Sequence, residues 1–321
     1  MRQHKRCFRL NSQKQKLQKE DHASLVSGAL RFWKTNSLYK NSGLLPSTRY
    51  GRCLELKVGM STLAFYHEPP EKAVEKVADL GFNLIEVVVD GEYRLKGKSI
   101  TQLRRLKRNL GLRLLVHAPF SDLNPASLNS AIQKESMKQL GECIESAASL
   151  GCEVVTLHPG HFSPYGIRLR EKVWNANVRC LSFCADLAEK LDVVLGVENM
   201  PSMLGVLIQN SKQLLEMVEA VNSKHLRVTL DVGHVATYGV QPLGFLEDVK
   251  DYIVNIHLHN NNGVTDIHSS IENGVIRYDA VLNRLVEVGY GGSLIVELYR
   301  SSDALQSRRW IENHLSQGKT Q

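Results

Sequence analysis

Nine histidine and carboxylate side chains stand at or just after the ends of short apolar segments, and these are residue types that bind metals. They are His117 in "VHAPF", His158 in "LHPGH", Glu198 in "VENM", Asp231 and His234 in "LDVGH", His257 in "NIHLH", Asp266 and His268 in "NNNGVTDIHSS", and Glu297 in "VEL". Imidazole nitrogens and carboxylate oxygens are donors that zinc and manganese take in proteins. Each residue alone also has a plain structural interpretation, because a carboxylate can cap a helix and a histidine can form hydrogen bonds in the interior. Four carboxylates buried together without cations would cost several kcal/mol, so their repetition favours metal binding if one fold brings them together.

The elements that must position these residues form a regular series from Lys57 onward. Apolar segments rich in Val, Ile and Leu occupy residues 57–61, 84–89, 113–117, 154–158, 194–198, 227–231, 253–257 and 294–298. They do not alternate with polar residues, which is typical of parallel strands covered on their outer face. Amphipathic helical stretches lie between them, for example at 70–80, 130–150 and 171–191. Several of these stretches end in glycine, at positions 81, 111, 151 and 289, where we expect the left-handed conformation that closes a helix.

Eight strands alternating with helices predict an α/β fold, a (β/α)₈ TIM barrel that forms a single domain over residues 57–315. The alternative, an open doubly wound sheet, would favour a glycine-rich phosphate turn after the first strand, and "KVGMSTLAFY" contains none. In a barrel the carboxyl ends of all strands meet at one rim, so the nine side chains should converge there. Five histidines and four carboxylates exceed the needs of one four-coordinate ion. We therefore expect up to three divalent metals, zinc first, with manganese or magnesium as alternatives, and we predict that His158 is a ligand.

The charge of the chain is unevenly distributed. It carries 40 Lys and Arg against 33 Asp and Glu, but residues 1–57 hold 13 of the basic and 3 of the acidic residues. Residues 1–56 are therefore predicted to be a basic, disordered extension, and 316–321 a short C-terminal tail. The body is mildly acidic, which weakens any argument for nucleic acid from net charge alone. Arg94, Lys96 and Lys98 after the second strand could meet a phosphate, although a solvated loop is the commoner explanation.

Two further features bear on where the protein works. Its six cysteines form no CxxC pair, which favours reduced thiols in a cytoplasmic protein over a disulfide framework. No run of eighteen apolar residues occurs, so we expect no membrane-spanning helix and no membrane partner. The sequence makes no prediction of the oligomeric state.

The strand-end motifs resemble those of the xylose-isomerase-like TIM barrel superfamily. This superfamily includes the apurinic-site endonucleases of the endonuclease IV type (AP endonuclease family 2) and many sugar isomerases and epimerases. The resemblance covers about residues 57 to 300, and all nine ligand types of the endonuclease trinuclear zinc site have counterparts here in the same order. It implies one metal held by His117, His158 and Glu198 and a second held by Glu198, Asp231, His257 and Glu297. It implies a third held by His234, Asp266 and His268.

Some flanking motifs depart from the endonucleases. "HAPFSDLN", "LDVGH" and "HLHNNNG" look more like the isomerase and epimerase branch, and such positions flank the metals and face DNA in the endonucleases. Two enzyme functions therefore stay open. The first is hydrolysis of a phosphoester, apurinic-site DNA or a phosphorylated small molecule, by a metal-bridging hydroxide, with Glu198 and Glu297 as catalytic residues. The second is isomerisation or epimerisation of a sugar or sugar phosphate.

The isomerase alternative needs fewer residues. One metal held by Glu198, Asp231, His257 and Glu297 would polarise the substrate, while the two glutamates move a proton between neighbouring carbons. It leaves the ligand-like placement of the other five residues unexplained, and this surplus favours hydrolysis. A non-catalytic function, as a metal-binding scaffold or a nucleic-acid tethering module, is the third hypothesis.

Overall fold

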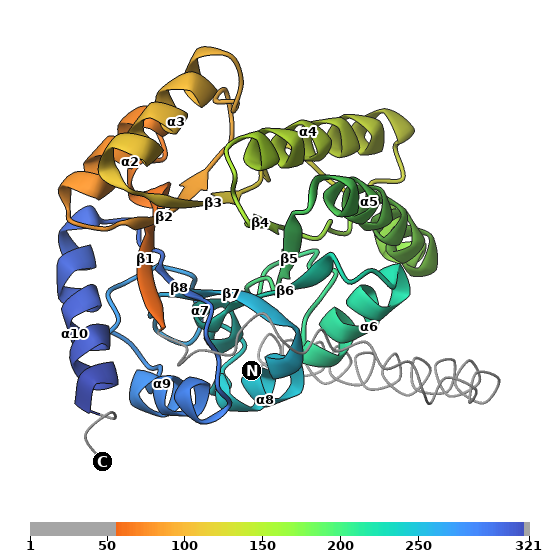
Figure 1. Cartoon of the computed structure of the whole chain (residues 1–321). Helices are drawn as coiled ribbons and strands as arrows, with labels where there is room; N and C mark the ends of the chain where they lie inside the picture. The colour runs from red at the N-terminus through yellow and green to blue at the C-terminus, as the bar shows by residue number, and fades with distance from the viewer. Residues whose placement is uncertain (1–55, 318–321) are drawn as a thin grey trace, which may run out of the picture. The chain divides into compact units, whose positions relative to one another are not determined.

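Eight parallel strands close into a barrel in the computed structural model, which describes residues 56–317 (Figure 1). The strands are β1 (Lys57–Ser61), β2 (Leu84–Val88), β3 (Arg113–His117), β4 (Val154–Leu157), β5 (Val194–Glu198), β6 (Leu226–Asp231), β7 (Ile253–Leu258) and β8 (Ser293–Val296). They follow one another in chain order around the barrel, and β8 pairs with β1 to close it. The predicted (β/α)₈ barrel is therefore confirmed. The predicted tails, 1–56 and 316–321, lie almost entirely outside the described residues.

Helices follow the strands and surround the barrel (Figure 1). They are α2 (Pro70–Asp79), α3 (Lys98–Leu110), α4 (Ser130–Ser149), α5 (Arg170–Leu191), α6 (Ser211–Val221), α7 (Val232–Ala236), α8 (Leu243–Val249), α9 (Tyr278–Glu287) and α10 (Ala304–Gln317). Short 3₁₀ turns lie at Thr62–Phe65, Gly166–Arg168, Lys250–Tyr252 and Ser301–Asp303. The four glycines expected to close helices all have positive φ, between +64° at Gly111 and +83° at Gly81. Each provides the sharp reversal that leads a helix back to the next strand.

Burial of both strand faces explains the continuous apolar segments. All five residues of β2 are buried, as are all four of β4 and of β8. Parallel strands in this setting pack helices outside and side chains inside, so alternation with polar residues is lost. The polar residues that do occur inside strands must therefore find partners within the barrel.

A layer of polar side chains lies inside the barrel. The hydroxyls of Thr156 and Thr229 are 3.1 Å apart, and Asn255 donates from Nδ2 to Glu86 Oε2 at 2.6 Å and to Thr156 Oγ1 at 3.2 Å. Gly196 leaves room for this layer, because a Cβ there would lie 2.1 Å from the Thr229 hydroxyl. These buried groups hydrogen-bond one another across four strands, and the layer supports the residues at the mouth.

The remaining composition-based expectations concern cysteines and membranes. Cys143, Cys152, Cys180 and Cys184 are free and buried, while Cys7 and Cys53 lie outside the described residues. Burial raises the pKa of the Cys143 thiol to about 12, which leaves it unreactive. Within residues 56–317, every helix is too short or too polar to cross a bilayer.

Candidate metal centre

All nine predicted residues lie at the carboxyl ends of the barrel strands. His117, Glu198 and Asp231 are the last residues of β3, β5 and β6, and His257 lies one residue before the end of β7. His158 and Glu297 come directly after β4 and β8. His234 lies in α7, and Asp266 and His268 belong to the loop between β7 and α9. Because parallel strands end at one rim of a barrel, segments spread over more than 180 residues of sequence meet here.

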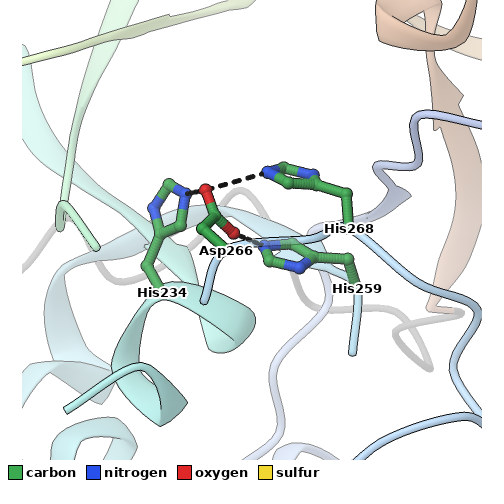
Figure 2. A group of neighbouring side chains, drawn as sticks. All are labelled: His234, His259, Asp266 and His268. Carbon is green, nitrogen blue, oxygen red and sulfur yellow. Dashed lines mark hydrogen bonds and ion pairs between the residues drawn. The ribbon is translucent and has the colours of Figure 1, made fainter. Parts of the chain in front are cut away.

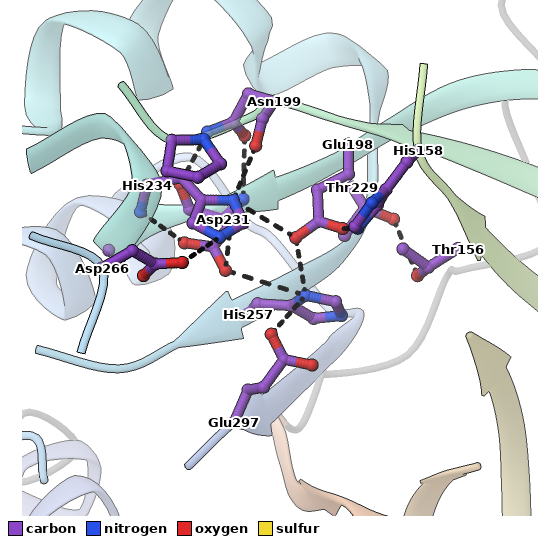
Figure 3. A network of polar contacts seen from close by, with 12 residues as sticks. Thr156, His158, Glu198, Asn199, Thr229, Asp231, His234, His257, Asp266 and Glu297 are labelled. Atoms are coloured by element: carbon purple, nitrogen blue, oxygen red, sulfur yellow. Dashed lines mark hydrogen bonds and ion pairs between the residues drawn. The ribbon is translucent and has the colours of Figure 1, made fainter. Parts of the chain in front are cut away.

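The side chains fall into three groups, each with donor atoms within 4.8 Å of one another. The groups are His117, His158 and Glu198; Glu198, Asp231, His257 and Glu297; and His234, His259, Asp266 and His268 (Figure 2). Glu198 belongs to two groups, and Figure 3 shows it between His158 and His257. The third group contains a residue, His259, that the sequence prediction did not assign as a ligand.

The central group gathers three carboxylates around one ring nitrogen. His257 Nδ1 lies 3.0 Å from Glu198 Oε1, 3.3 Å from Glu297 Oε2 and 3.8 Å from Asp231 Oδ2 (Figure 3). All four residues are buried, and Asp231 Oδ2 has no hydrogen-bond partner among the described residues. Three buried carboxylates beside one imidazole leave excess negative charge, which costs free energy unless a cation is bound. The donor set therefore fits a divalent ion held by nitrogen and oxygen.

In the first group, two imidazoles converge on one carboxylate oxygen. Glu198 Oε2 lies 3.0 Å from His158 Nε2 and 3.3 Å from His117 Nε2. Glu198 thus presents one oxygen to these histidines and the other to His257. A carboxylate so placed has the geometry of a bridge between two metal positions.

Glu86 contacts the central group, and the sequence analysis did not identify it. It is fully buried inside β2, and its Oε1 lies 2.9 Å from His257 Nε2. A hydrogen bond from Nε2–H to this carboxylate leaves the Nδ1 lone pair of His257 facing the central group. The only sequence signal is one acidic residue within the apolar run "LIEVVV".

Main-chain carbonyls orient three further histidines in the same manner. The hydrogen bonds run from His117 Nδ1 to Ala118 O (2.9 Å), from His234 Nδ1 to Asn199 O (2.8 Å), and from His268 Nδ1 to Glu297 O (3.0 Å). A carbonyl can only accept, so Nδ1 carries a proton in each case, and in the neutral ring Nε2 keeps its lone pair for a metal. All three Nε2 atoms face carboxylate oxygens, as in metal sites where the second nitrogen is fixed from outside.

Asp231 also has the structural function considered above for a carboxylate at a strand end, which is to cap a helix. It is the N-cap of α7, and its Oδ1 accepts the main-chain N–H of His234 at 2.6 Å. The same carboxylate turns Oδ2 toward His257. One side chain therefore caps a helix and faces the candidate centre, and the two interpretations do not compete.

The carboxylates dominate the electrostatics of the metal-free mouth. Burial by itself lowers the pKa of His117, but the hydrogen bond and charge of Glu198 outweigh it and raise the pKa to about 9. Burial likewise opposes the charged form of His234, whereas Asp231 and Asp266 raise its pKa to about 10. Burial would raise the pKa of Glu198, yet the charge of His257 and hydrogen bonds from histidines hold it well below its usual range. Without metal, protons on the rings balance the carboxylates.

A cavity of about 540 Å³ opens over the three groups. Its wall is largely apolar and includes Leu63, Phe120, Met200, Met203 and Leu204. Among the described residues that line it, none is Lys or Arg. Arg94 and Lys96 line a separate cavity of about 250 Å³. The described lining therefore offers a small molecule metal ligands and apolar walls, and a phosphate there would depend on a bound metal and not on a side-chain cation.

Comparison with known proteins identifies the family and matches the barrel fold. A family model described as "Xylose isomerase-like TIM barrel" matches residues 74–314. The Uncharacterized protein MJ1311 of Methanocaldococcus jannaschii is 36% identical over 265 residues, which are 82% of this chain and 90% of that protein. The crystal structure of a D-tagatose 3-epimerase-like protein superposes with a TM-score of 0.77 at 35% identity, covering 81% of this chain and 97% of the other.

A protein named "Probable endonuclease 4" from Mesomycoplasma hyopneumoniae is more distant. It is 29% identical over 175 residues, which cover 51% of this chain and 60% of that protein.

Proposed function

The chain belongs to the xylose isomerase-like TIM barrel family, and on that premise we propose that it is a metal-dependent epimerase or isomerase of a small sugar-like hydroxy ketone. The observation that carries the proposal is the central group, in which two glutamates, one aspartate and one histidine converge and the two glutamates line the cavity. The likeness to a D-tagatose 3-epimerase-like protein over most of both chains supports this alternative over the hydrolysis that the ligand count first favoured.

Glu198, Asp231, His257 and Glu297 would hold the metal. A divalent ion bound there supplies Lewis acidity that polarises the carbonyl and the neighbouring hydroxyl of a substrate. Glu198 and Glu297 lie within 3.3 Å of the same nitrogen of His257, and both line the cavity that a bound substrate would enter. Glu86 keeps His257 in the tautomer that presents Nδ1.

Both glutamates favour the ionised state, which is the state that the base in a proton transfer requires. Burial would raise the pKa of Glu297, but the charge and hydrogen bond of His257 hold it below its ordinary range, as for Glu198. One ionised glutamate takes the proton from the carbon that bears the hydroxyl beside the carbonyl. The other would first take up a proton from solvent and deliver it to the opposite face, and the first would return its proton to solvent, so one C–H bond breaks, another forms and the composition is unchanged.

The cavity wall supports an uncharged substrate. Sites that recognise a phosphate away from the metal often place Arg or Lys where the anion sits, and no such residue lines the described part of this cavity. Apolar contacts from Phe120 and Met200 exclude water around the reacting carbon and suit the C–H faces of a free sugar. We therefore place free ketoses ahead of sugar phosphates.

A second candidate, phosphoester hydrolysis at a multinuclear zinc site, has one observation in its favour. Three donor groups adjoin one another, and Glu198 contributes to two of them. The relative named "Probable endonuclease 4" fits this function but matches only about half of the chain.

One experiment tests both candidates. The full chain, loaded with Mn²⁺ or Zn²⁺, is incubated in D₂O with D-tagatose, L-ribulose and D-fructose, and deuterium incorporation beside the carbonyl is followed by NMR. The same preparation is tested for nicking of a duplex with one abasic site. We expect exchange without nicking, and a loss of exchange of at least about 10²-fold in Glu198→Gln and Glu297→Gln.

Glu247→Gln is the matched control, because Glu247 lies in α8 and pairs with Arg284 away from the mouth. It should exchange like the wild type. Nicking by a loaded protein that exchanges no ketose would replace the proposal with the second candidate.

A further inference from the structure

Asp90 is a buried carboxylate outside the three donor groups at the mouth. It lies two residues after the end of β2 and is 5% exposed. Its Oδ1 accepts the main-chain N–H groups of Phe120 at 3.1 Å and Ser121 at 3.0 Å, and its Oδ2 accepts the Tyr66 hydroxyl at 2.8 Å. Burial would raise the pKa of Asp90, but hydrogen bonds from Ser121 and Tyr66 hold it below its ordinary value. The acceptor is therefore ionised, and ionised acceptors form the stronger hydrogen bonds.

These hydrogen bonds join the segments that follow three neighbouring strands. Tyr66 comes after β1, Asp90 after β2 and Phe120 after β3, and the three strands lie side by side in the barrel (Figure 1). The Tyr66 hydroxyl also lies 3.3 Å from Ser121 Oγ. Just beyond, Asp122 has φ of +58°, an uncommon conformation for a residue with a side chain. The anchoring of the two preceding N–H groups by Asp90 therefore fixes the loop where the chain turns.

Phe120 is the residue of this loop that meets the candidate centre. It lines the cavity, and neither Asp90 nor Tyr66 belongs to the described lining. The Phe120 ring lies 4.8 Å from the ring of His158 between centroids, with the planes 31° apart, and 5.4 Å from the ring of His117. The Tyr66 ring is stacked on Phe120 at 6.4 Å, with the planes 24° apart. An aromatic face beside a polar donor set can contact the C–H face of a sugar while the hydroxyls of the sugar meet the polar groups.

We propose that Asp90 is a positioning residue that fixes Phe120 as the wall against which the carbon face of the ketose binds. The inference rests on the proposed function, because it assigns a role in binding that substrate. Asp90 does not line the cavity, so it acts through the two main-chain N–H groups that it holds. Loss of Asp90 should therefore weaken ketose binding and leave the chemistry at Glu198 and Glu297 unchanged.

Steady-state kinetics of deuterium exchange into D-tagatose separates these two effects. For Asp90→Ala we expect KM to rise about 10-fold, the size of one lost aromatic contact, and kcat to stay within about threefold of the wild type. Asp90→Asn should stay within about twofold in KM, because its carbonyl oxygen still accepts both main-chain N–H groups and its amide can donate to the Tyr66 hydroxyl. Asp186→Ala is the matched control, because Asp186 is exposed in α5, and it should behave like the wild type.

A double-mutant cycle tests whether Asp90 acts through Phe120. Phe120→Leu should itself raise KM about 10-fold. Adding Asp90→Ala to that variant should raise KM by less than about twofold more, because the ring that Asp90 positions is already gone. Equal rises in KM on both backgrounds would overturn the proposal. So would a fall in kcat without a rise in KM in Asp90→Ala.

Amide hydrogen exchange, followed by NMR on the full chain, tests the positioning without any substrate. The N–H groups of Phe120 and Ser121 should exchange slowly in the wild type and in Asp90→Asn, and at least about 10-fold faster in Asp90→Ala. Unchanged protection in Asp90→Ala would overturn the positioning role. If Asp90→Ala does not fold, Tyr66→Phe takes its place, because it removes the hydroxyl that Asp90 and Ser121 share, and it should speed exchange of the same groups about threefold. A wild type that exchanges no ketose would refute the proposed function, and the amide result would still decide whether Asp90 positions Phe120.

Discussion

Replacing Glu86 by glutamine tests whether a residue inside the barrel controls metal binding at its mouth. Glu86 accepts two hydrogen bonds, from His257 Nε2 at 2.9 Å and from Asn255 Nδ2 at 2.6 Å, and is fully buried. Glutamine has nearly the same shape but offers one acceptor and one donor. One of the two donors that face it must then meet another N–H, or His257 must move its proton to Nδ1. In that tautomer the nitrogen facing the central group no longer has a free lone pair.

The expected size of the effect follows from this geometry. Loss of a hydrogen bond that orients a metal-ligating histidine typically lowers metal affinity about 10- to 100-fold. That is about 1.4–2.7 kcal/mol of binding free energy, at about 1.4 kcal/mol for each tenfold change. Competition against a chromophoric chelator measures it directly for Mn²⁺ at the central group. Glu247→Gln removes an exposed carboxylate and should bind like the wild type.

The proposed role of Glu86 fails if Glu86→Gln binds Mn²⁺ within twofold of the wild type while its circular dichroism spectrum is unchanged. Unchanged affinity would mean that His257 presents Nδ1 to the metal without the hydrogen bond from its Nε2 to Glu86. If Glu86→Gln does not fold, Asn255→Asp takes its place in the test. This substitution keeps Glu86 but removes the N–H group that Asn255 donates to it. It should weaken Mn²⁺ binding through the loss of the Asn255 donor.

Two further predictions concern protons and packing. In the metal-free protein the pKa of His117 is raised to about 9 and that of His234 to about 10. Protonation of these two rings should therefore stabilise the folded protein fully below pH about 6.5, the pKa of histidine in the unfolded chain. This stabilisation should be lost as the pH rises through the two raised pKa values. A metal binds only the neutral rings, so metal binding at pH 7 should release protons. Titration calorimetry in buffers of different ionisation enthalpy measures that release. If no protons are released, the rings were already neutral and the raised pKa values are wrong. Gly196→Ala should destabilise the protein by about 1–3 kcal/mol in urea unfolding, because its Cβ would lie 2.1 Å from Thr229 Oγ1. Gly141→Ala, whose Cβ would make contacts no shorter than 3.4 Å, should be neutral or stabilising, and equal effects of the two would refute the packing argument.

The sequence predicts the barrel well because its signals are local. Apolar runs and helix-closing glycines mark each strand and each helix end, and the structure shifts the strand bounds by only one or two residues. In β8, for example, the strand ends at Val296, so that Glu297 follows it rather than lying inside it. Side chains at successive strand ends then come together because all strands of the barrel are parallel and end at the same rim.

The residues that prediction missed depend on contacts between distant segments. Glu86 lies within an apolar run, and only its contact with His257, 171 residues away, shows that it serves the mouth. His259 had a usable signal, since residues 257 and 259 are two apart in extended chain and share a face. Its ring also needs Gly233, because a Cβ there would lie 2.1 Å from one of its atoms, and how closely α7 approaches that ring cannot be read from either segment alone.

The main-chain hydrogen bonds to His117, His234 and His268 have a consequence for how this mouth tolerates change. Their acceptors are carbonyl oxygens of residues 118, 199 and 297, which every amino acid possesses. A substitution at Ala118, for instance, keeps the carbonyl oxygen and therefore does not change which nitrogen of His117 is available. During evolution the side chains at these acceptor positions can therefore change while His117, His234 and His268 keep the orientation of their rings. By contrast, the ring of His257 is oriented by the side chain of Glu86, so substitutions at position 86 should be tolerated far less.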